Sequence, residues 1–190
     1  MSTPANGYST GPETSLLASA LKLLDSVNLA ARYGVGALLG VATISVTYQI
    51  LIRFVLDYFG VNIAAPWTEE VARYALIWVV FVGAGIVCRH SGLIAVDIVP
   101  HALPSPYGRY VKIASILVTI CFFGVLAWIG VEFAATGSIE TSPVMRIPMS
   151  FVYFAVPVGS LLAIVNLASL LLESICLGRD IIQTDADASE

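Results

Sequence analysis

Four long stretches of this sequence contain no Asp, Glu, Lys or Arg, and they constrain the fold more than any other feature. They cover residues 33–52, 74–88, 113–131 and 147–172. A helix of about 20 apolar residues, rising 1.5 Å per residue, covers the roughly 30 Å of bilayer hydrocarbon. The second stretch is shorter, so its charged flanks must lie close to the bilayer. Together with a composition of 58% hydrophobic and 12% charged residues, this pattern predicts a polytopic membrane protein.

We therefore expect an all-α integral membrane protein with four transmembrane helices and interfacial amphipathic helices. The expected organisation is a disordered tail over 1–13, a membrane domain over 14–176 with spans at about 33–53, 71–89, 111–132 and 149–173, and an acidic tail over 177–190. Leucines recur at helical spacing between 14 and 29, which predicts either a helix on the membrane surface or an extension of the first span. Residues 93–99 predict a second, short interfacial element.

The distribution of basic residues predicts the orientation. Four crossings place both termini on one side, together with Lys22, Arg32, Arg89, Arg109, Lys112 and Arg179, whereas Arg53, Arg73 and Arg146 fall on the other side. Because short cytoplasmic loops carry the excess of Lys and Arg, we expect both termini in the cytoplasm.

The span interiors lack the groups that most membrane chemistry needs. No acid, lysine or histidine lies in the middle of a span, whereas a proton-driven carrier normally needs a titratable group there. His90 and His101 both fall in the loop after the second span, which disfavours a bis-histidine haem site. No nucleophile with a base, phosphate-binding loop or zinc spacing is evident. The sequence thus predicts no catalytic residue, no cofactor, no metal site and no nucleic-acid partner.

The stretch PWTEEVARY, residues 66–74, places charges at the start of the second span. Thr68 is expected to cap the helix, Trp67 to anchor it at the membrane interface, and the acidic pair to complement the helix dipole. Arg73 follows Glu69 by four residues and Glu70 by three, so its guanidinium could reach both carboxylates. The stretch is then either a capped interfacial helix or, because the span is short, a paired charge cluster buried against protein.

Small residues in the spans provide another signal. Gly36 and Gly40 form a GxxxG motif in the first span, and Gly83 thins the second. Such positions let helix backbones approach closely in lipid. The partner is either another helix of this chain or a second subunit.

Three segments of the chain resemble one protein family. PWTEEVARYALIWVVFVGAGIVCR, GLIAVDIVPHALP and TSPVMRIPMSFVYFAVPVGSLL are similar, in this order, to the small membrane subunit (DctQ-like) of tripartite ATP-independent periplasmic (TRAP) transporters. The resemblance covers about residues 30–172. It implies a non-enzymatic scaffold subunit of the bacterial inner membrane that braces a large multispan permease subunit. It also implies docking of a periplasmic substrate-binding protein and sodium-coupled uptake of an organic anion or related solute.

The resemblance also implies roles for particular residues. The expected subunit interface comprises Trp67, Glu69, Glu70, Arg73, Gly36, Gly40 and Gly83, and the expected docking residues are Glu140 and Arg146. Two alternatives stay open: a membrane anchor subunit of a respiratory oxidoreductase, and a small autonomous exporter.

Overall fold

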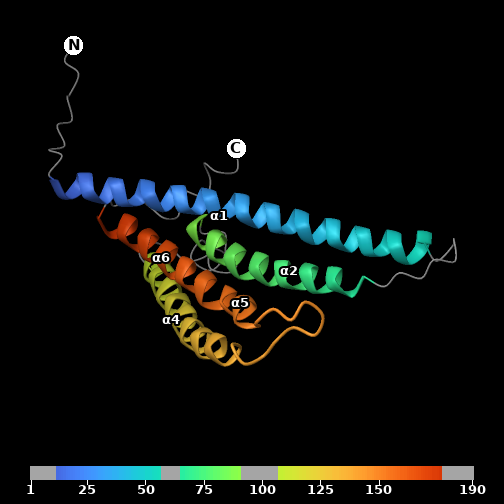
Figure 1. Cartoon of the computed structure of the whole chain (residues 1–190). Helices are drawn as coiled ribbons and strands as arrows, with labels where there is room; N and C mark the ends of the chain where they lie inside the picture. Colours follow the sequence, from blue (N-terminus) through green and yellow to red (C-terminus); the bar gives the residue numbers. More distant parts are fainter. Residues whose placement is uncertain (1–11, 57–64, 91–106, 177–190) are drawn as a thin grey trace, which may run out of the picture.

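The computed structural model describes residues 12–56, 65–90 and 107–176, which are almost entirely helical (Figure 1). In chain order the elements are α1 (Pro12–Leu51), a π-helical turn η1 (Ile52–Leu56), α2 (Pro66–Val87), a 3₁₀ turn η2 (Cys88–His90), α4 (Tyr107–Thr136), α5 (Ser150–Tyr153) and α6 (Ala155–Cys176). Four helical segments are long and apolar enough to cross a membrane: Ser19–Val55, Pro66–Val87, Tyr110–Thr136 and Ser150–Leu172. The predicted all-α class with four spanning helices is confirmed.

The first helix is much longer than a bilayer crossing requires. Its 40 residues extend about 60 Å at 1.5 Å per residue, twice the hydrocarbon thickness. The amphipathic stretch 14–29 is part of this continuous helix, so it extends the first span and does not form a separate helix. The predicted interfacial element at 93–99, His101, most of the N-terminal tail and the C-terminal tail lie outside the described residues.

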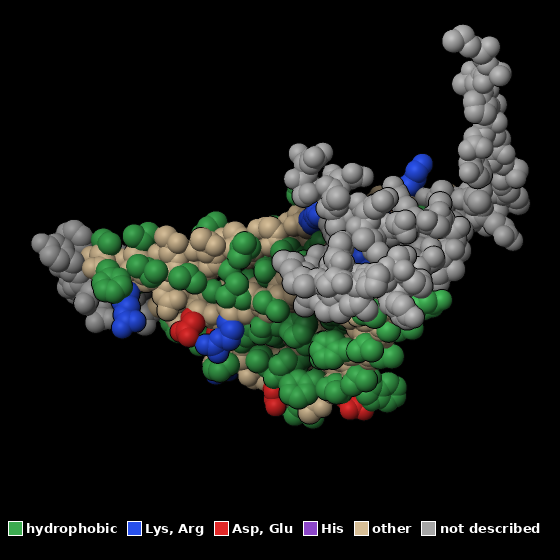
Figure 2. Space-filling model, turned by 180° about the vertical axis from the view of Figure 1, so that it is seen from behind, with side chains coloured by type: hydrophobic (Ala, Val, Ile, Leu, Met, Phe, Trp, Pro, Cys, Tyr) green, Lys and Arg blue, Asp and Glu red, His purple; other side chains and the backbone are tan. Residues whose placement is uncertain are grey.

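The helices form an open layer in which each packs mainly on its neighbour (Figure 1). α1 lies on α2, α2 on α6, and α6 on α4. The central position of α6 is clear from burial, since 44% of its most apolar window is buried against 11% for α1 and for α4. The two edge helices therefore leave most of their apolar surface uncovered. Figure 2 shows this surface, where hydrophobic side chains dominate and charged ones are few.

One narrow stripe of α1 faces α2. Asn28, Val35, Ala42 and Gln49, seven residues apart, are buried or half-buried, and so are the residues at the intervening positions of a 3–4 spacing. This is the spacing of a coiled-coil seam. The opposite face of α1 is open, as the 74% exposure of Tyr33 and the 70% exposure of Ile44 show.

The close helix crossings use glycines other than those singled out in the sequence. A Cβ atom at Gly85 of α2 would lie 2.8 Å from the carbonyl oxygen of Gly159 in α6, and one at Gly130 of α4 would lie 2.9 Å from atoms of Val156 and Pro157. A Cβ atom at Gly159 would collide with the backbone of Phe81. The α2–α6 and α4–α6 contacts therefore require glycine at these positions.

The three glycines expected at an interface make no close helix contact within the described part of the chain. A Cβ atom at Gly36, Gly40 or Gly83 would meet no atom within 4 Å. On α1, Gly36 and Gly40 lie on the side opposite the seam with α2, given 100° of rotation per residue. Of the two alternatives for these glycines, packing within the described part of the chain is thus excluded.

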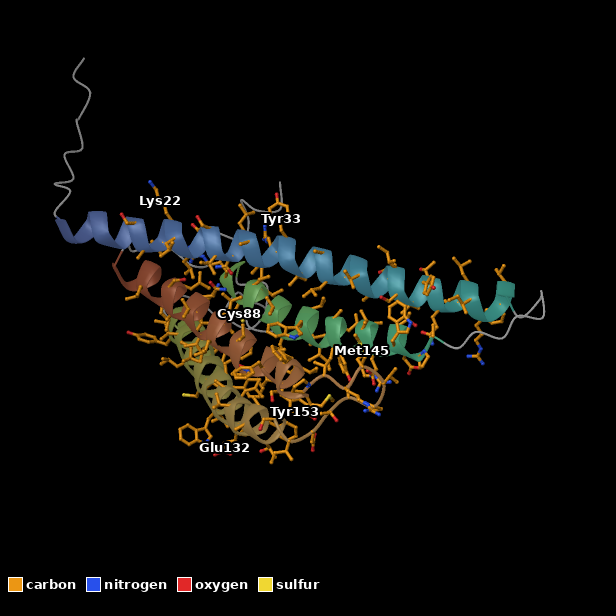
Figure 3. The ribbon with its side chains drawn as sticks, viewed as in Figure 1. Lys22, Tyr33, Cys88, Glu132, Met145 and Tyr153 are labelled. Carbon is orange, nitrogen blue, oxygen red and sulfur yellow. The ribbon has the colours of Figure 1, made fainter. Side chains whose placement is uncertain are left out.

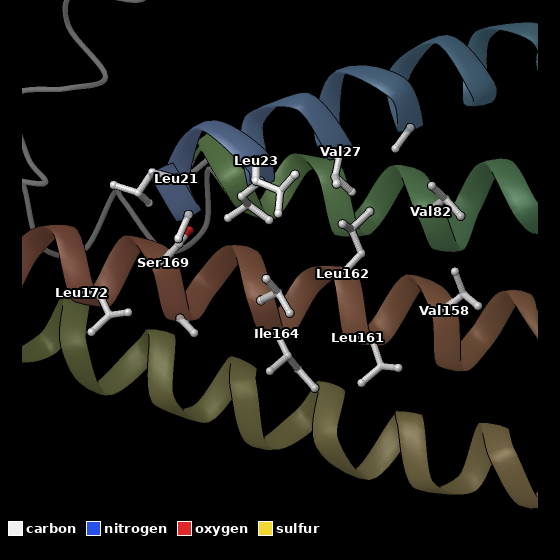
Figure 4. Close-up of a pocket in the computed structure, with 15 residues that line it drawn as sticks. Leu21, Leu23, Val27, Val82, Val158, Leu161, Leu162, Ile164, Ser169 and Leu172 are labelled. Atoms are coloured by element: carbon white, nitrogen blue, oxygen red, sulfur yellow. The ribbon is translucent and has the colours of Figure 1, made fainter. Parts of the chain in front are cut away.

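An apolar groove of about 820 Å³ separates the N-terminal part of α1 from α6 (Figure 4). Its walls are aliphatic side chains such as Leu21 and Val27 of α1 and Leu161 and Val165 of α6, and Ser169 is the polar residue among those that line it. Binding sites for polar solutes present several convergent polar groups. The groove therefore suits lipid or apolar side chains better than an anionic solute.

The glycine contacts lead to a first prediction. Gly159→Leu should destabilise the isolated chain by about 1–3 kcal/mol, because overpacking forces α2 and α6 apart. Gly83→Leu, the matched control on α2, should be tolerated. Thermal unfolding of both variants in detergent checks this, and equal midpoints for the two variants would contradict it.

Candidate functional site

A buried carboxylate clasps the loop between α4 and α5. Glu70 lies in the first turns of α2 and is only 6% exposed. Its Oε2 accepts hydrogen bonds from the Ser142 hydroxyl at 2.8 Å and the Met145 N–H at 3.0 Å, and its Oε1 accepts one from the Val144 N–H at 3.0 Å. A buried carboxylate is tolerated only when such donors replace water. We call Glu70 with residues 140–149 the Glu70 clasp.

The loop in the clasp has a fixed backbone. The Ser142 N–H donates to the Ile147 carbonyl at 2.9 Å, the Arg146 N–H donates to the Ser142 carbonyl at 3.2 Å, and Thr141 and Pro148 form an antiparallel bridge. Arg146 has a φ of 54°, in the left-handed region that side chains other than glycine rarely adopt. Such a conformation persists only where surrounding contacts over-determine it. The clasp supplies those contacts.

Two further residues of α2 extend the clasp along one helix face. Tyr74 and Trp78 follow Glu70 at intervals of four residues, so all three share a face. The Tyr74 hydroxyl contacts the Met149 sulfur at 3.6 Å, and the Trp78 indole N–H donates to the Phe151 carbonyl at 3.2 Å. This face of α2 thus holds the chain from 142 to 151. Figure 3 shows Met145 beside the start of α2, whereas Lys22 and Tyr33 point away from the other helices.

Glu69 and Arg73 form a separate, exposed pair. The Arg73 guanidinium lies 2.9 Å from Glu69 Oε1, with side-chain exposures of 64% and 60%. The prediction that Arg73 bridges both glutamates is wrong, because the loop occupies both carboxylate oxygens of Glu70 and the ion pair of Arg73 is with Glu69. Exposed pairs of this kind contribute only about 0.3–0.5 kcal/mol. The pair is therefore available for contact with another molecule at little cost to the fold.

The start of α2 also differs from the prediction. The helix begins at Pro66 with Ala65 as its N-cap residue, so Thr68 lies inside the first turn and does not cap it. Thr68 is fully buried and its hydroxyl donates to the Ala65 carbonyl at 2.7 Å. Proline suits the first helical position, where its missing N–H costs nothing. Trp67 is 46% exposed and packs against Tyr48 of α1, with ring centroids 6.0 Å apart.

The two residues expected to dock a partner lie on the same loop. Glu140 is exposed, and its Oε2 accepts a hydrogen bond from the Tyr153 hydroxyl at 3.1 Å. Arg146 is exposed too. The structure thus places both at the end of the molecule where α2 begins and brings Glu70 next to them.

A second polar cluster joins three helices at the opposite end of the layer. Asn28 of α1 and Asn166 of α6 exchange two amide hydrogen bonds of 2.7 and 2.8 Å, and Asn166 also donates to the Gly85 carbonyl at 2.8 Å. The Arg89 guanidinium donates to Asp25 at 3.0 Å and to the Ser169 hydroxyl at 2.9 Å. Paired amides and ions satisfy one another where water is scarce.

Two asparagines are the sequence features that could have indicated this cluster. Asn166 is a strongly polar amide in the middle of an apolar stretch, and Asn28 falls in the amphipathic segment that proved to be part of α1. A buried amide needs a hydrogen-bonding partner, but the position of each asparagine in the sequence does not identify that partner. In the described ranges no group of three His, Cys, Asp or Glu side chains could hold a metal ion.

Comparison with known proteins places the chain in a family. The family model described as "Tripartite ATP-independent periplasmic transporters, DctQ component" matches residues 42–177, well over half of the chain. The chain belongs to the DctQ family. The resemblance seen in the sequence is thereby confirmed, and the anchor and exporter alternatives find no support.

Curated relatives agree with the assignment. The chain is 25% identical to the C4-dicarboxylate TRAP transporter small permease protein DctQ of Rhodobacter capsulatus, over 74% of this chain and 72% of the relative. It is 26% identical to a putative TRAP transporter small permease protein of Haemophilus influenzae, over 66% of this chain and 78% of the relative. It is 30% identical to the isethionate TRAP transporter permease protein DctMQ of Oleidesulfovibrio alaskensis, over 60% of this chain.

The chain spans only 18% of the length of that DctMQ relative. Membership of the DctQ family and four apolar helices make this DctQ-like subunit a multi-pass protein of the inner membrane. Among the described residues, the Glu70 clasp and the Asn28–Asn166 cluster lie at opposite ends of the helix layer.

The second cluster leads to a prediction about stability. Asn166→Leu should destabilise the chain by about 1–3 kcal/mol, because it removes both hydrogen bonds between Asn28 and Asn166 and the bond to the Gly85 carbonyl. Asn28→Leu combined with Asn166→Leu should cost less than the sum of the single variants, since no unpaired amide remains. Unfolding in mixed micelles measures all three, and strict additivity would count against an amide pair.

Proposed function

We propose that this DctQ-like chain is a non-enzymatic scaffold subunit that braces a large multispan TRAP permease subunit and helps to dock a periplasmic substrate-binding protein. The observation that carries the proposal is the open helix layer. Its edge helices leave most of their apolar surface uncovered. Gly36 and Gly40 face outward on α1, where a Cβ atom would meet no other described residue within 4 Å. Small residues on an outward helix face permit close packing of another membrane helix.

The names of the relatives support the partner and the solute class. One relative is a permease protein named DctMQ, and this chain matches a small part of it, so a segment of this kind occurs within a longer permease chain. Two relatives are named for isethionate and for C4-dicarboxylates, which are organic anions. We propose sodium-coupled uptake of an organic anion or related solute, with the solute and ion carried by the large subunit.

The excess of basic residues at the Arg89 end supports an orientation with both termini in the cytoplasm. The Glu70 clasp then faces the periplasm. Glu140 and Arg146 are thereby proposed to meet the substrate-binding protein.

The proposed contact with the large subunit uses residues that contribute little to packing between the described helices. They are Gly36 and Gly40 on α1, with Gly83, Trp67, Glu69 and Arg73 on α2. Glu70, which the sequence placed in the same set, is proposed instead to act within the chain, because its carboxylate oxygens are occupied by the loop.

Co-purification tests the bracing role. Gly36→Leu should reduce the yield of the complex with the large permease subunit about tenfold, because a bulky side chain separates the helix backbones. The isolated chain should stay stable, since leucine has a higher helix propensity than glycine. Gly124→Leu on α4, where a Cβ atom also meets nothing within 4 Å, is the matched control. Equal losses in both variants would contradict an interface on α1.

The exposed ion pair provides a separate test. Arg73→Ala should weaken co-purification or uptake without reducing membrane insertion, because the pair contributes little to the fold. Quantitative immunoblots of membranes against complex yield separate the two effects. Unchanged complex yield and unchanged uptake would remove Arg73 from the interface.

A further inference from the structure

The loop in the Glu70 clasp is held from inside and exposed outside. The N–H groups of Val144 and Met145 point to the buried carboxylate, while the two residues as a whole are 43% and 39% exposed. Ile139, just before the clasp, is 86% exposed. Exposed apolar side chains gathered on one loop mark a contact surface more often than a free one. The loop is thus a rigid surface element whose shape depends on one side chain.

Arg146 supplies the positive charge of this surface, on the same loop as Glu140, whose carboxylate accepts a hydrogen bond from Tyr153. The Arg146 guanidinium is exposed, and the ion pairs between described residues, Arg73–Glu69 and Arg89–Asp25, do not include it. Its left-handed backbone follows from the hydrogen bond to Ser142, the residue whose hydroxyl binds Glu70. Backbone strain of this kind collects at functional positions, where a side chain must be held in a set direction.

We propose that Glu70 is a positioning residue: its buried carboxylate fixes the 142–146 loop so that Arg146 is presented to an acidic patch on a soluble partner protein. This inference rests on the proposed docking function and deepens it. Rigid presentation reduces the entropy lost on binding, and an unpaired surface arginine favours encounter with negative charge. Val144 and Met145 supply the apolar part of the same contact.

The carboxylate is essential to this arrangement for a chemical reason. It accepts three hydrogen bonds and offers no donor, whereas glutamine of the same shape has one acceptor oxygen and an NH₂ group that would face the donors of the loop. Glu70→Gln therefore releases the loop while changing the volume of the side chain very little. Glu69→Gln, one residue away, leaves all three bonds intact.

Hydrogen–deuterium exchange of the complex with the large subunit tests the clasp directly. Glu70→Gln should speed exchange of the Val144 and Met145 amides about tenfold, because their hydrogen bonds to a charged group are lost. Ser142→Ala, which removes one donor and leaves both amide bonds, should give a smaller increase. Lys22→Gln, which lies at the opposite end of the helix layer and outside the proposed interface, should leave the exchange unchanged. Equal exchange in the Glu70→Gln variant and the wild type would overturn the proposal.

Uptake into proteoliposomes tests presentation of Arg146. The binding-protein concentration that gives half-maximal uptake should rise about tenfold for Glu70→Gln, while the maximal rate stays close to that of the wild type. Arg146→Glu should raise it further than Arg146→Gly, since glycine fits the positive φ and only loses the charge. Lys22→Gln on α1, an exposed residue at the opposite end of the helix layer from the loop, is the control.

Coupling between the two residues completes the test. If Glu70 acts through Arg146, then Glu70→Gln should add little to the half-maximal concentration once Arg146→Gly is present. Full additivity would overturn the proposal even if both single variants are impaired. Loss of co-purification with the large subunit, in contrast, would reveal failure of the bracing role and not of the loop. If Glu70→Gln yields no complex, Ser142→Ala carries the same measurements.

Discussion

The structure depends on the cost of leaving a polar group unsatisfied away from water. In hydrocarbon each unpaired donor or acceptor costs several kcal/mol by transfer estimates. Among the described residues, the Ser160 hydroxyl is the buried side-chain group that lacks a partner. Two clusters of hydrogen-bonded polar groups connect the described helices. At one end the Glu70 carboxylate collects three donors from the loop between α4 and α5. At the other end Asn28, Gly85 and Asn166 connect α1, α2 and α6. The apolar helix faces between them pack through glycine and alanine.

Polar clusters at the ends and close apolar packing between them explain why the helix layer can stay open. A soluble four-helix protein must close its core, because water drives apolar surface together. Lipid exerts no such force between helices, and close packing and polar contacts take its place. The chain packs α2 on α6 at Gly85 and Gly159, and α4 on α6 at Gly130, and leaves both edge helices largely uncovered. An exposed edge with an outward GxxxG is what a scaffold needs if its binding energy comes from a second membrane protein.

The positions of single residues show how far sequence reasoning reached. The charge-free stretches predicted four spanning helices because length and hydropathy decide whether a helix can cross a bilayer. The Glu69–Arg73 pair followed from helix periodicity alone. The role of Glu70 did not, since its partners lie 72 to 75 residues away along the chain, on a loop whose shape no local rule specifies. Thr68 was assigned to the cap because the pattern did not show that α2 begins at Pro66.

The sequence by itself determined four spans with no charged residue in the middle of a span, and three of its segments carried the resemblance to the DctQ family. Composition and periodicity act along the chain, and so a reading along the chain recovers them. Only the tertiary structure decided which glycines pack inside and which face outward, and which of two adjacent glutamates is buried. Helix rotation and long-range pairing settle those choices, because a rotation of 100° between neighbouring residues turns one side chain to the surface and the next to the core.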